Sequence, residues 1–204
     1  MIEPSRHRAH LVCAALAVAA LLAPRASLAQ DCPTAETAKS GFVVERNERQ
    51  KSEVFRDDTG LVHTVMRYGG TTLLETTQFE GIFQLERLDR GLRTTYETSE
   101  NLQALFPLKP GQQAHAKFIS QRDGQYGRLY VELDVRAPED LFIGPCKYSV
   151  LRIDRRESTS AVPPQFVYTE LYSPDLELIL AREYKRQNGE TQLIKYDRIY
   201  PLKK

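Results

Sequence analysis

From Gly41 onward, apolar and polar residues alternate along most of the chain, and this period of two is typical of β-strands that bury one face. The clearest example is Tyr126–Arg136. Its two faces are Leu129, Val131, Leu133 and Val135 on one side and Arg128, Tyr130, Glu132, Asp134 and Arg136 on the other. One face of this strand is therefore predicted to lie in a core and the other in water.

The carboxy-terminal stretch Gln165–Tyr200 predicts three antiparallel strands joined by two tight turns. Pro174-Asp175 favours the first turn, because proline presets φ at a turn corner. Asn188-Gly189 favours the second, because both central residues of a type I′ turn need positive φ. The strands are expected at Gln165–Ser173, Leu176–Arg186 and Thr191–Tyr200.

Similar turn signals, such as Gly69-Gly70 and Asp123-Gly124, separate the other alternating runs. Their spacing of about eight to twelve residues predicts an all-β protein with little helix and about eleven or twelve strands. Twist makes a sheet of this size close or split. We therefore expect a single curled antiparallel sheet, an up-and-down meander that forms an open or half barrel.

The first 29 residues have the composition of a secretory signal peptide. A basic segment, Arg6-His7-Arg8, precedes the apolar run Leu11–Ala23, and Ser27-Leu28-Ala29 supplies small residues for cleavage. The alternative is a retained membrane anchor, but the apolar run is shorter than the roughly 20 residues that span a bilayer. We expect a periplasmic protein in which Gln30–Lys204 forms a single antiparallel β domain with no transmembrane segment.

The cysteines predict a covalent link in the exported chain. Cys13 would leave with the signal peptide, and Cys32 and Cys146 would remain. An even cysteine count in an exported protein favours a disulfide, although two unpaired thiols are the alternative. In the chain-entropy model, closing so long a loop stabilises a fold by about 4–5 kcal/mol.

The charge of the predicted mature chain is close to zero. Residues 1–29 hold three of the 28 basic residues and one of the 27 acidic ones, which leaves 25 basic and 26 acidic side chains. This balance argues against a nucleic-acid-binding surface. It also argues against strong attraction to anionic membranes.

Few residues offer a reaction centre. His63 and His115 are the histidines of the mature chain, and neither stands at the spacing of a metal site. Asp57-Asp58 is a possible carboxylate pair, but a turn explains the sequence Asp-Asp-Thr-Gly more simply. We therefore predict no catalytic residue, no metal and no cofactor.

Tyrosines are the more suggestive group, because they gather in the carboxy-terminal half. If the sheet curls, one face could present an aromatic cleft for a hydrophobic or amphiphilic ligand. The alternative is ordinary aromatic packing in a core. The candidate ligand-binding residues are Tyr130, Tyr148, Tyr168, Tyr172, Tyr184 and Tyr196.

Three segments together carry a resemblance: Phe106–Gly111, Ile143–Tyr148, and Tyr172–Leu176 followed by Arg182–Tyr184. Their order resembles that of uncharacterised exported Gram-negative β-domains and covers roughly residues 82–200. These domains are in turn reminiscent of the LolA/LolB lipoprotein-carrier half barrel. The resemblance implies a half-barrel fold in the cell envelope.

The functional prediction is a non-enzymatic cell-envelope protein. It would hold a hydrophobic or amphiphilic ligand, or an envelope partner protein, in the cleft of the half barrel. The alternative is a hydrolase or lyase that acts on an envelope polymer. That activity would need two carboxylates, or His63 or His115 with a carboxylate, converging in one cleft.

Overall fold

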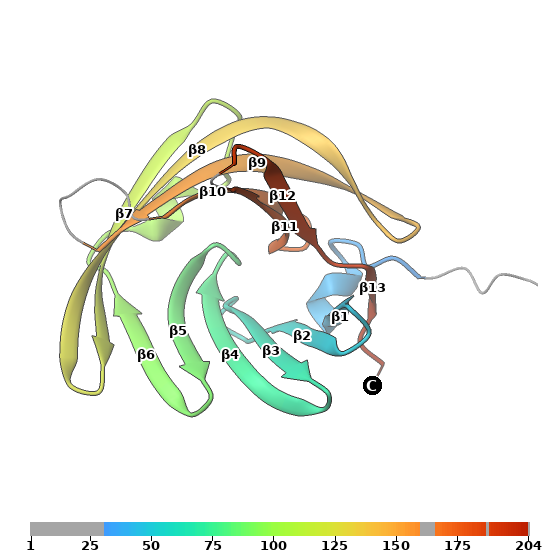
Figure 1. Ribbon diagram of the computed structural model, residues 1–204, viewed down its shortest axis with the longest axis horizontal. Helices are drawn as coiled ribbons and strands as arrows, with labels where there is room; N and C mark the ends of the chain where they lie inside the picture. The colour runs from blue at the N-terminus through green and yellow to red at the C-terminus, as the bar shows by residue number, and fades with distance from the viewer. Residues whose placement is uncertain (1–30, 160–165, 187, 204) are drawn as a thin grey trace, which may run out of the picture.

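The computed structural model describes residues 31–159, 166–186 and 188–203, so the predicted signal peptide lies outside the described residues. Within them the chain forms one antiparallel sheet of thirteen strands (Figure 1). Two short 3-10 helices, η2 at Thr37–Ser40 and η3 at Leu102–Leu105, accompany the sheet. None of the helices in the described ranges is long and apolar enough to span a membrane. The all-β prediction is confirmed.

The strands follow one another as a meander. They are β1 Phe42–Arg46, β2 Gln50–Arg56, β3 Val62–Tyr68, β4 Thr71–Phe79, β5 Phe83–Asp89, β6 Leu92–Glu97, β7 Gln113–Arg122, β8 Gln125–Ile143, β9 Cys146–Ser158, β10 Phe166–Ser173, β11 Leu178–Lys185, β12 Thr191–Lys195 and β13 Arg198–Pro201. Each strand from β2 to β11 pairs with its neighbours in sequence, as an up-and-down meander requires. The predicted hairpins at Gly69-Gly70 and Asp123-Gly124 are present, with positive φ at all four residues.

The last predicted strand, Thr191–Tyr200, is wrong as a single element. The chain breaks at Tyr196-Asp197, and the two halves pair with opposite ends of the sheet. β12 pairs with β11, whereas β13 pairs with β1. Because β12 and β13 are consecutive, the sheet has to curl until its two ends lie next to each other, as Figure 1 shows. The result is an open barrel, and this break accounts for the additional strand.

One part of the barrel interior is densely filled. We call this part the filled core; it lies under β7–β10 and includes Ile82, Phe83, Ala116, Phe118, Val131, Leu133, Val135, Ile153 and Tyr172. The alternation predicted for Tyr126–Arg136 is confirmed here, because Val131, Leu133 and Val135 are buried. Their burial supplies hydrophobic stabilisation in proportion to the apolar area removed from water.

A second cluster, the closure core, lies where the sheet ends meet. It includes Phe42, Val44, Val54, Ile143, Val150, Leu176, Leu180 and Ile199. The tip of the β8–β9 hairpin reaches this cluster and is joined to the chain ahead of η2 by the Cys32–Cys146 disulfide. The predicted disulfide is confirmed, across a sequence separation of 114 residues.

The β4–β5 turn closes the interior from the other side. The Tyr172 hydroxyl donates a hydrogen bond of 2.9 Å to the Glu80 carbonyl. Gly81 follows in the left-handed region, at φ +64°, and a Cβ added there would lie 1.8 Å from the Glu177 carbonyl oxygen. Only a glycine therefore lets this turn rest on the β10–β11 turn.

Candidate functional site

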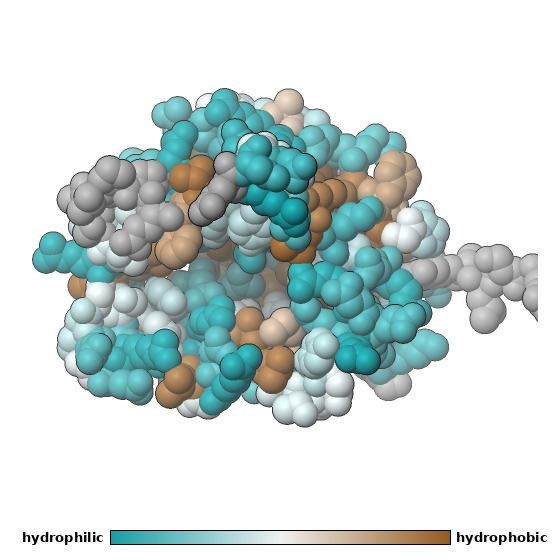
Figure 2. All heavy atoms as spheres, in the orientation of Figure 1, coloured by the Kyte–Doolittle hydropathy of each residue, from teal (hydrophilic) through white to brown (hydrophobic). Residues whose placement is uncertain are grey.

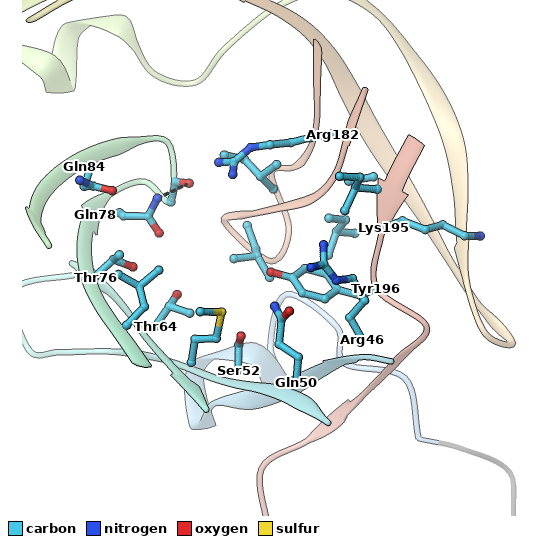
Figure 3. A pocket seen from close by; sticks show the side chains of 18 of the residues that line it. Arg46, Gln50, Ser52, Thr64, Thr76, Gln78, Gln84, Arg182, Lys195 and Tyr196 are labelled. Carbon is cyan, nitrogen blue, oxygen red and sulfur yellow. Dashed lines mark hydrogen bonds between the residues drawn. The ribbon is translucent and has the colours of Figure 1, made fainter. Parts of the chain in front are cut away.

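A cavity of about 270 Å³ lies inside the barrel, between β2–β5 on one side and β11–β12 on the other (Figure 3). Its lining includes Arg46, Gln50, Ser52, Thr64, Met66, Leu74, Thr76, Gln78, Gln84, Arg87, Leu178–Arg182, Tyr184 and Ile194–Tyr196. The space-filling view shows the molecule hollowed between these two layers, with hydrophilic and hydrophobic side chains both near the opening (Figure 2).

The wall formed by β2–β5 is largely polar. Successive side chains of a strand point to opposite faces, so each strand contributes every second residue to the interior. On β2, β3 and β4 the inward positions include Ser52, Thr64 and Thr76 (Figure 3). Thr64 and Thr76 are directly paired across the β3–β4 ladder. The same alternation that fills the core under β8 therefore lines this wall with hydroxyl groups.

The facing wall is largely apolar. Leu178, Ile179, Leu180 and Ala181 on β11 line the cavity, and Ile194 on β12 adds to them. All four β11 residues are buried. Leu178 and Leu180 also belong to the closure core, so the apolar wall is held in place by packing from behind. The cavity thus has one largely hydrogen-bonding side and a facing side on which Arg182 and Tyr196 add polar groups to an apolar wall.

Four cationic residues border the cavity, whereas its lining among the described residues includes no aspartate or glutamate. Three of the four have partners. Arg87 pairs with Asp89 at 2.6 Å, and the Lys195 ammonium donates to the Phe142 carbonyl at 3.0 Å. Arg182 donates through Nε to Glu170 at 3.0 Å. The fourth is Arg46, at the end of β1.

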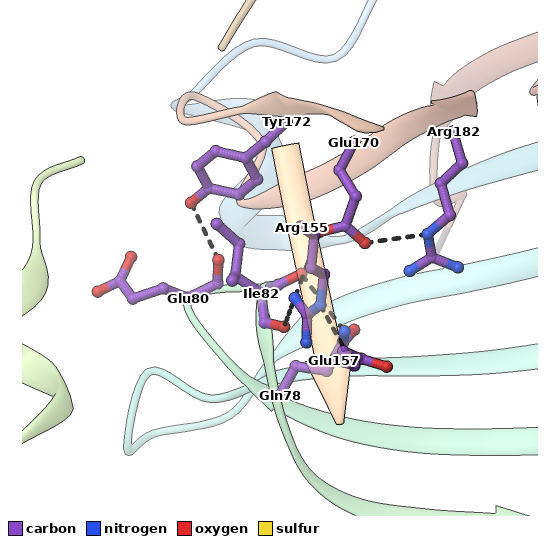
Figure 4. Close-up of polar contacts among 9 residues, drawn as sticks. Gln78, Glu80, Ile82, Arg155, Glu157, Glu170, Tyr172 and Arg182 are labelled. Atoms are coloured by element: carbon purple, nitrogen blue, oxygen red, sulfur yellow. Dashed lines mark hydrogen bonds and ion pairs between the residues drawn. The ribbon is translucent and has the colours of Figure 1, made fainter. Parts of the chain in front are cut away.

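Glu170 anchors a buried polar network beside the cavity (Figure 4). Its carboxylate is fully buried, and Arg155 donates to it at 3.3 Å while Arg182 donates at 3.0 Å. Arg155 also donates to Glu157 at 2.8 Å and to the Ile82 carbonyl at 3.2 Å. A buried carboxylate needs such partners, because an unpaired charge away from water is costly.

The network sets the charge state of its arginines. Burial alone would lower the pKa of Arg155 and Arg182, but the negative charge of Glu170 outweighs it and raises both above their ordinary value. Arg182 keeps 42% of its side-chain surface accessible, because it borders the cavity. It therefore presents a fixed positive charge to the cavity while its Nε holds Glu170.

Two of the six candidate tyrosines line the cavity, Tyr184 and Tyr196. A third, Tyr168, packs against Tyr184 with ring centroids 5.6 Å apart, and the Arg182 guanidinium lies 5.6 Å from the Tyr168 centroid. Burial raises the pKa of the Tyr196 hydroxyl, although the charges of Arg182 and Arg46 oppose that effect. Tyr196 is thus a neutral hydroxyl near two guanidinium groups.

The other three candidate tyrosines lie elsewhere. Tyr172 belongs to the filled core, and Tyr148 is buried in the closure core, where burial raises its pKa to about 12. Tyr130 borders a separate hollow between the end of β6 and strands β7 and β8. The sheet therefore does not bring the six rings into one cleft. The polar wall and Arg46 were not predicted from the sequence. For the polar wall, the inward positions of β2–β4 were the available signal.

His63 has a carboxylate partner, but outside the barrel. Its Nε2 lies 2.7 Å from Asp57 Oδ2, and its Nδ1 lies 3.2 Å from the Thr77 hydroxyl. His63 is offset by one residue from Thr64, so strand alternation places it on the outer face. Hydrogen bonds from the Thr59 hydroxyl and from His63 hold the pKa of Asp57 well below its usual range. Asp57 also accepts from the backbone of its own turn, in accordance with the turn interpretation.

His115 is exposed on β7. Among the residues that the structure describes, no group of three or more His, Cys, Asp or Glu side chains is placed to hold a metal ion.

No family model matches this chain, and no curated protein matches it. A solved structure to which it is similar is the hypothetical lipoprotein YmcC from Escherichia coli (K12). The sequence identity is 12%, the TM-score is 0.46, and the match covers 76% of this chain and 86% of that chain. The resemblance to the LolA/LolB carriers is not shown by these comparisons and stays a prediction. A similarity of this degree assigns no role to any residue of the cavity.

Proposed function

We propose that this protein is an exported cell-envelope protein that binds a small amphiphilic molecule inside its barrel. The observation that carries this proposal is the cavity of about 270 Å³ with one polar and one apolar wall. An amphiphile matches such a cavity, because its apolar part removes area from water beside β11 and its polar part reaches polar side chains of the lining. These polar side chains lie on β2–β5 and also include Arg46, Arg182 and Tyr196.

The barrel interior is hollow at this cavity but densely packed elsewhere. Protein interiors are normally close-packed, and the same sheet is densely filled under β7–β10. The volume of about 270 Å³ lies just below the range for drug-sized ligand sites, which is roughly 300–1,000 Å³, and therefore suits a small ligand. A ligand is therefore favoured over the alternative of a purely structural scaffold with a filled interior.

Two features support the export of the protein. The amino-terminal residues have the composition of a cleaved signal peptide, and the disulfide would persist in an oxidising compartment such as the periplasm. The test is the intact mass of protein purified from periplasm. The expected mass lacks residues 1–29 and the two hydrogen atoms that are lost when the disulfide forms, whereas a full-length mass would contradict cleavage.

The alternative of a hydrolase or lyase has less support from the site. The buried carboxylate of Glu170, beside the cavity, is held by two arginines, and the cavity lining in the described part of the chain includes no carboxylate. The Asp57–His63 pair faces away from the cavity. These positions do not form the converging acid and base that such a reaction needs.

Binding of octanol tests the proposed function, with calorimetric titration of the disulfide-bonded protein as the measurement. Thr76→Phe places a ring in the cavity and is expected to weaken binding at least tenfold, about 1.4 kcal/mol. Thr77→Phe is the matched control, because Thr77 is the adjacent residue on the outer face, beside His63. Equal affinities of both variants, or no binding to the unsubstituted protein, would overturn the proposal.

A further inference from the structure

We propose that the bound amphiphile carries one anionic head, a carboxylate or a phosphate, which the guanidinium of Arg46 binds with the help of Arg182 and the Tyr196 hydroxyl. This inference rests on the proposed function and specifies the chemistry of its ligand. The three side chains border the same cavity and come from β1, β11 and the end of β12 (Figure 3).

Arg46 is the cavity cation that lacks a hydrogen-bond partner for a buried N–H group within the described residues. Its Nε is buried and has no hydrogen-bond partner in the described part of the chain. Within the described residues Arg46 also forms no ion pair with a carboxylate. Arg87 and Arg182, in contrast, each form an ion pair. A guanidinium with a buried, unsatisfied N–H is costly unless a ligand supplies the acceptor. Its fork of donors matches the two oxygens of a carboxylate or phosphate.

The backbone around Arg46 is fixed where the sheet ends meet. The Asp197 N–H donates to the Glu45 carbonyl at 2.8 Å, and the Asn47 N–H donates to the Asp197 carboxylate at 2.8 Å. These bonds join the residues on both sides of Arg46 to the residue after Tyr196. The Asp197 carboxylate is thereby engaged by Asn47. Arg46 and Tyr196 are thus held on rigid backbone before any ligand arrives, which lowers the ordering cost of binding.

A second buried polar group in the cavity also lacks a partner. The Thr64 hydroxyl, on the wall opposite β11, is buried and makes no hydrogen bond within the described ranges. Four buried side-chain atoms in the described residues lack a hydrogen bond, and one of them, Glu45 Oε2, is ion-paired with Arg198. Of the other three, those of Arg46 and Thr64 belong to cavity-lining residues. Buried polar atoms normally have partners, so two orphans around one cavity indicate a ligand that provides acceptors.

Local charge, rather than the charge of the whole chain, selects an anion. The whole chain has a formal net charge of +1, and the predicted mature chain is close to −1, so neither attracts anions strongly. The cavity lining, in contrast, combines arginines with no acidic residue among those described. A cationic head placed in the cavity would be repelled by the guanidinium groups of Arg46 and Arg182, which border it.

Three probes that differ only in their heads test the inference: octanoate, octanol and octylamine. Calorimetric titration of the disulfide-bonded protein should give octanoate an affinity at least about tenfold higher than that of octanol, with octylamine weakest. Arg46→Gln should weaken octanoate binding about tenfold and change octanol binding less than about twofold. Octyl phosphate distinguishes the two head classes, since whichever of octanoate and octyl phosphate binds more tightly identifies the preferred anion.

Arg49→Gln is the matched control. It removes the same charge from an exposed position in the β1–β2 turn, three residues away, and should leave octanoate affinity unchanged. Equal affinities for octanoate and octanol, or equal effects of the two arginine substitutions, would overturn the anionic head while leaving the proposed function standing. Failure of every probe to bind would overturn both.

Discussion

The filled core and the cavity are built from the same strand alternation and differ only in which residues the strands turn inward. β8 directs Val131, Leu133 and Val135 into the barrel, and these side chains are buried. β3 and β4 direct Thr64 and Thr76 into it, and these line open space. The composition of the inward positions, rather than the topology, therefore decides where this barrel is solid and where it is hollow.

The filled core and the cavity wall should also contribute differently to folding stability and to ligand binding. Close-packed aliphatic and aromatic side chains supply most of the favourable free energy of folding. The inward hydroxyl and amide groups of β2–β5 bury less apolar area, and one of them, the Thr64 hydroxyl, has no hydrogen-bond partner among the described residues. Substitutions in the filled core should therefore affect stability, whereas substitutions around the cavity should affect binding.

The largest expected effect is that of Gly81→Ala, at the turn that closes the interior between the two regions. The added Cβ would lie 1.8 Å from the Glu177 carbonyl oxygen, so both backbone segments would have to move. We expect a loss of more than about 4 kcal/mol in the free energy of unfolding, measured by urea denaturation.

Gly91→Ala is the control for Gly81→Ala. Gly91 is also left-handed, at φ +86°, but a Cβ there would meet nothing within 4 Å. Its substitution should cost only the left-handed conformation, about 1–2 kcal/mol. Equal losses for the two variants would show that the β4–β5 turn does not rest tightly on the β10–β11 turn.

The next effect compares the two regions directly. Leu133→Ala removes a fully buried side chain from the filled core and should cost about 2–5 kcal/mol of unfolding free energy. Thr76→Ala, on the cavity wall, should change it by less than about 1 kcal/mol, because little packing is lost. Chemical denaturation of both variants measures the contrast, and a comparable loss for Thr76→Ala would contradict the division between a stabilising core and a binding wall.

The sequence was sufficient for most of the fold, because strands and turns are specified locally. Alternation identified β8, and Gly69-Gly70 and Asp123-Gly124 identified hairpins that need positive φ. The cysteine count indicated the Cys32–Cys146 bond. The break at Tyr196-Asp197 was not predicted, because it depends on pairing with β1, about 150 residues earlier, for which no local pattern exists.

The site was predicted less well, because it depends on which residues remain unpaired in three dimensions. The prediction from tyrosine content included Tyr184 and Tyr196, which line the cavity. It also included Tyr148 and Tyr172, which are buried in the closure core and the filled core. Sequence alone does not distinguish a ring in a cavity from a ring in a core. Sequence alone does not distinguish Arg46 from any other arginine at a strand end. Its buried Nε without a hydrogen-bond partner among the described residues is a property of the three-dimensional structure.

Loss of the disulfide should affect the cavity side of the molecule more than the filled core. Cys32→Ser with Cys146→Ser releases the segment ahead of η2 from the β8–β9 hairpin tip and should cost about 2–4 kcal/mol of unfolding free energy. Amide hydrogen exchange should accelerate in β1 and β13, which pack in the closure core, more than in the middle of β8. Uniform acceleration across the sheet would show that the bond stabilises the fold globally rather than the junction of the sheet ends.

The smallest expected change in the free energy of unfolding is that of Thr64→Val, which tests why the cavity wall is polar. Thr64→Val replaces a buried hydroxyl that has no partner in the described residues with a methyl group of the same shape. Removing an unsatisfied polar atom should leave the free energy of unfolding unchanged or raise it by up to about 1 kcal/mol. Thr77→Val is the control on the outer face, where it breaks the 3.2 Å contact with His63 and should lower stability slightly.

If denaturation shows that Thr64→Val is at least as stable as the unsubstituted protein, the Thr64 hydroxyl does not stabilise the fold. Its retention then has to be explained by what the cavity holds, since binding sites commonly keep groups that stability alone would not select. A clear loss of stability would instead mean that the hydroxyl has a partner in the folded protein, such as an ordered water. In that case the polar wall would be a hydrated part of the folded core. The filled core and the cavity would then differ in how much buried water they hold and not in function.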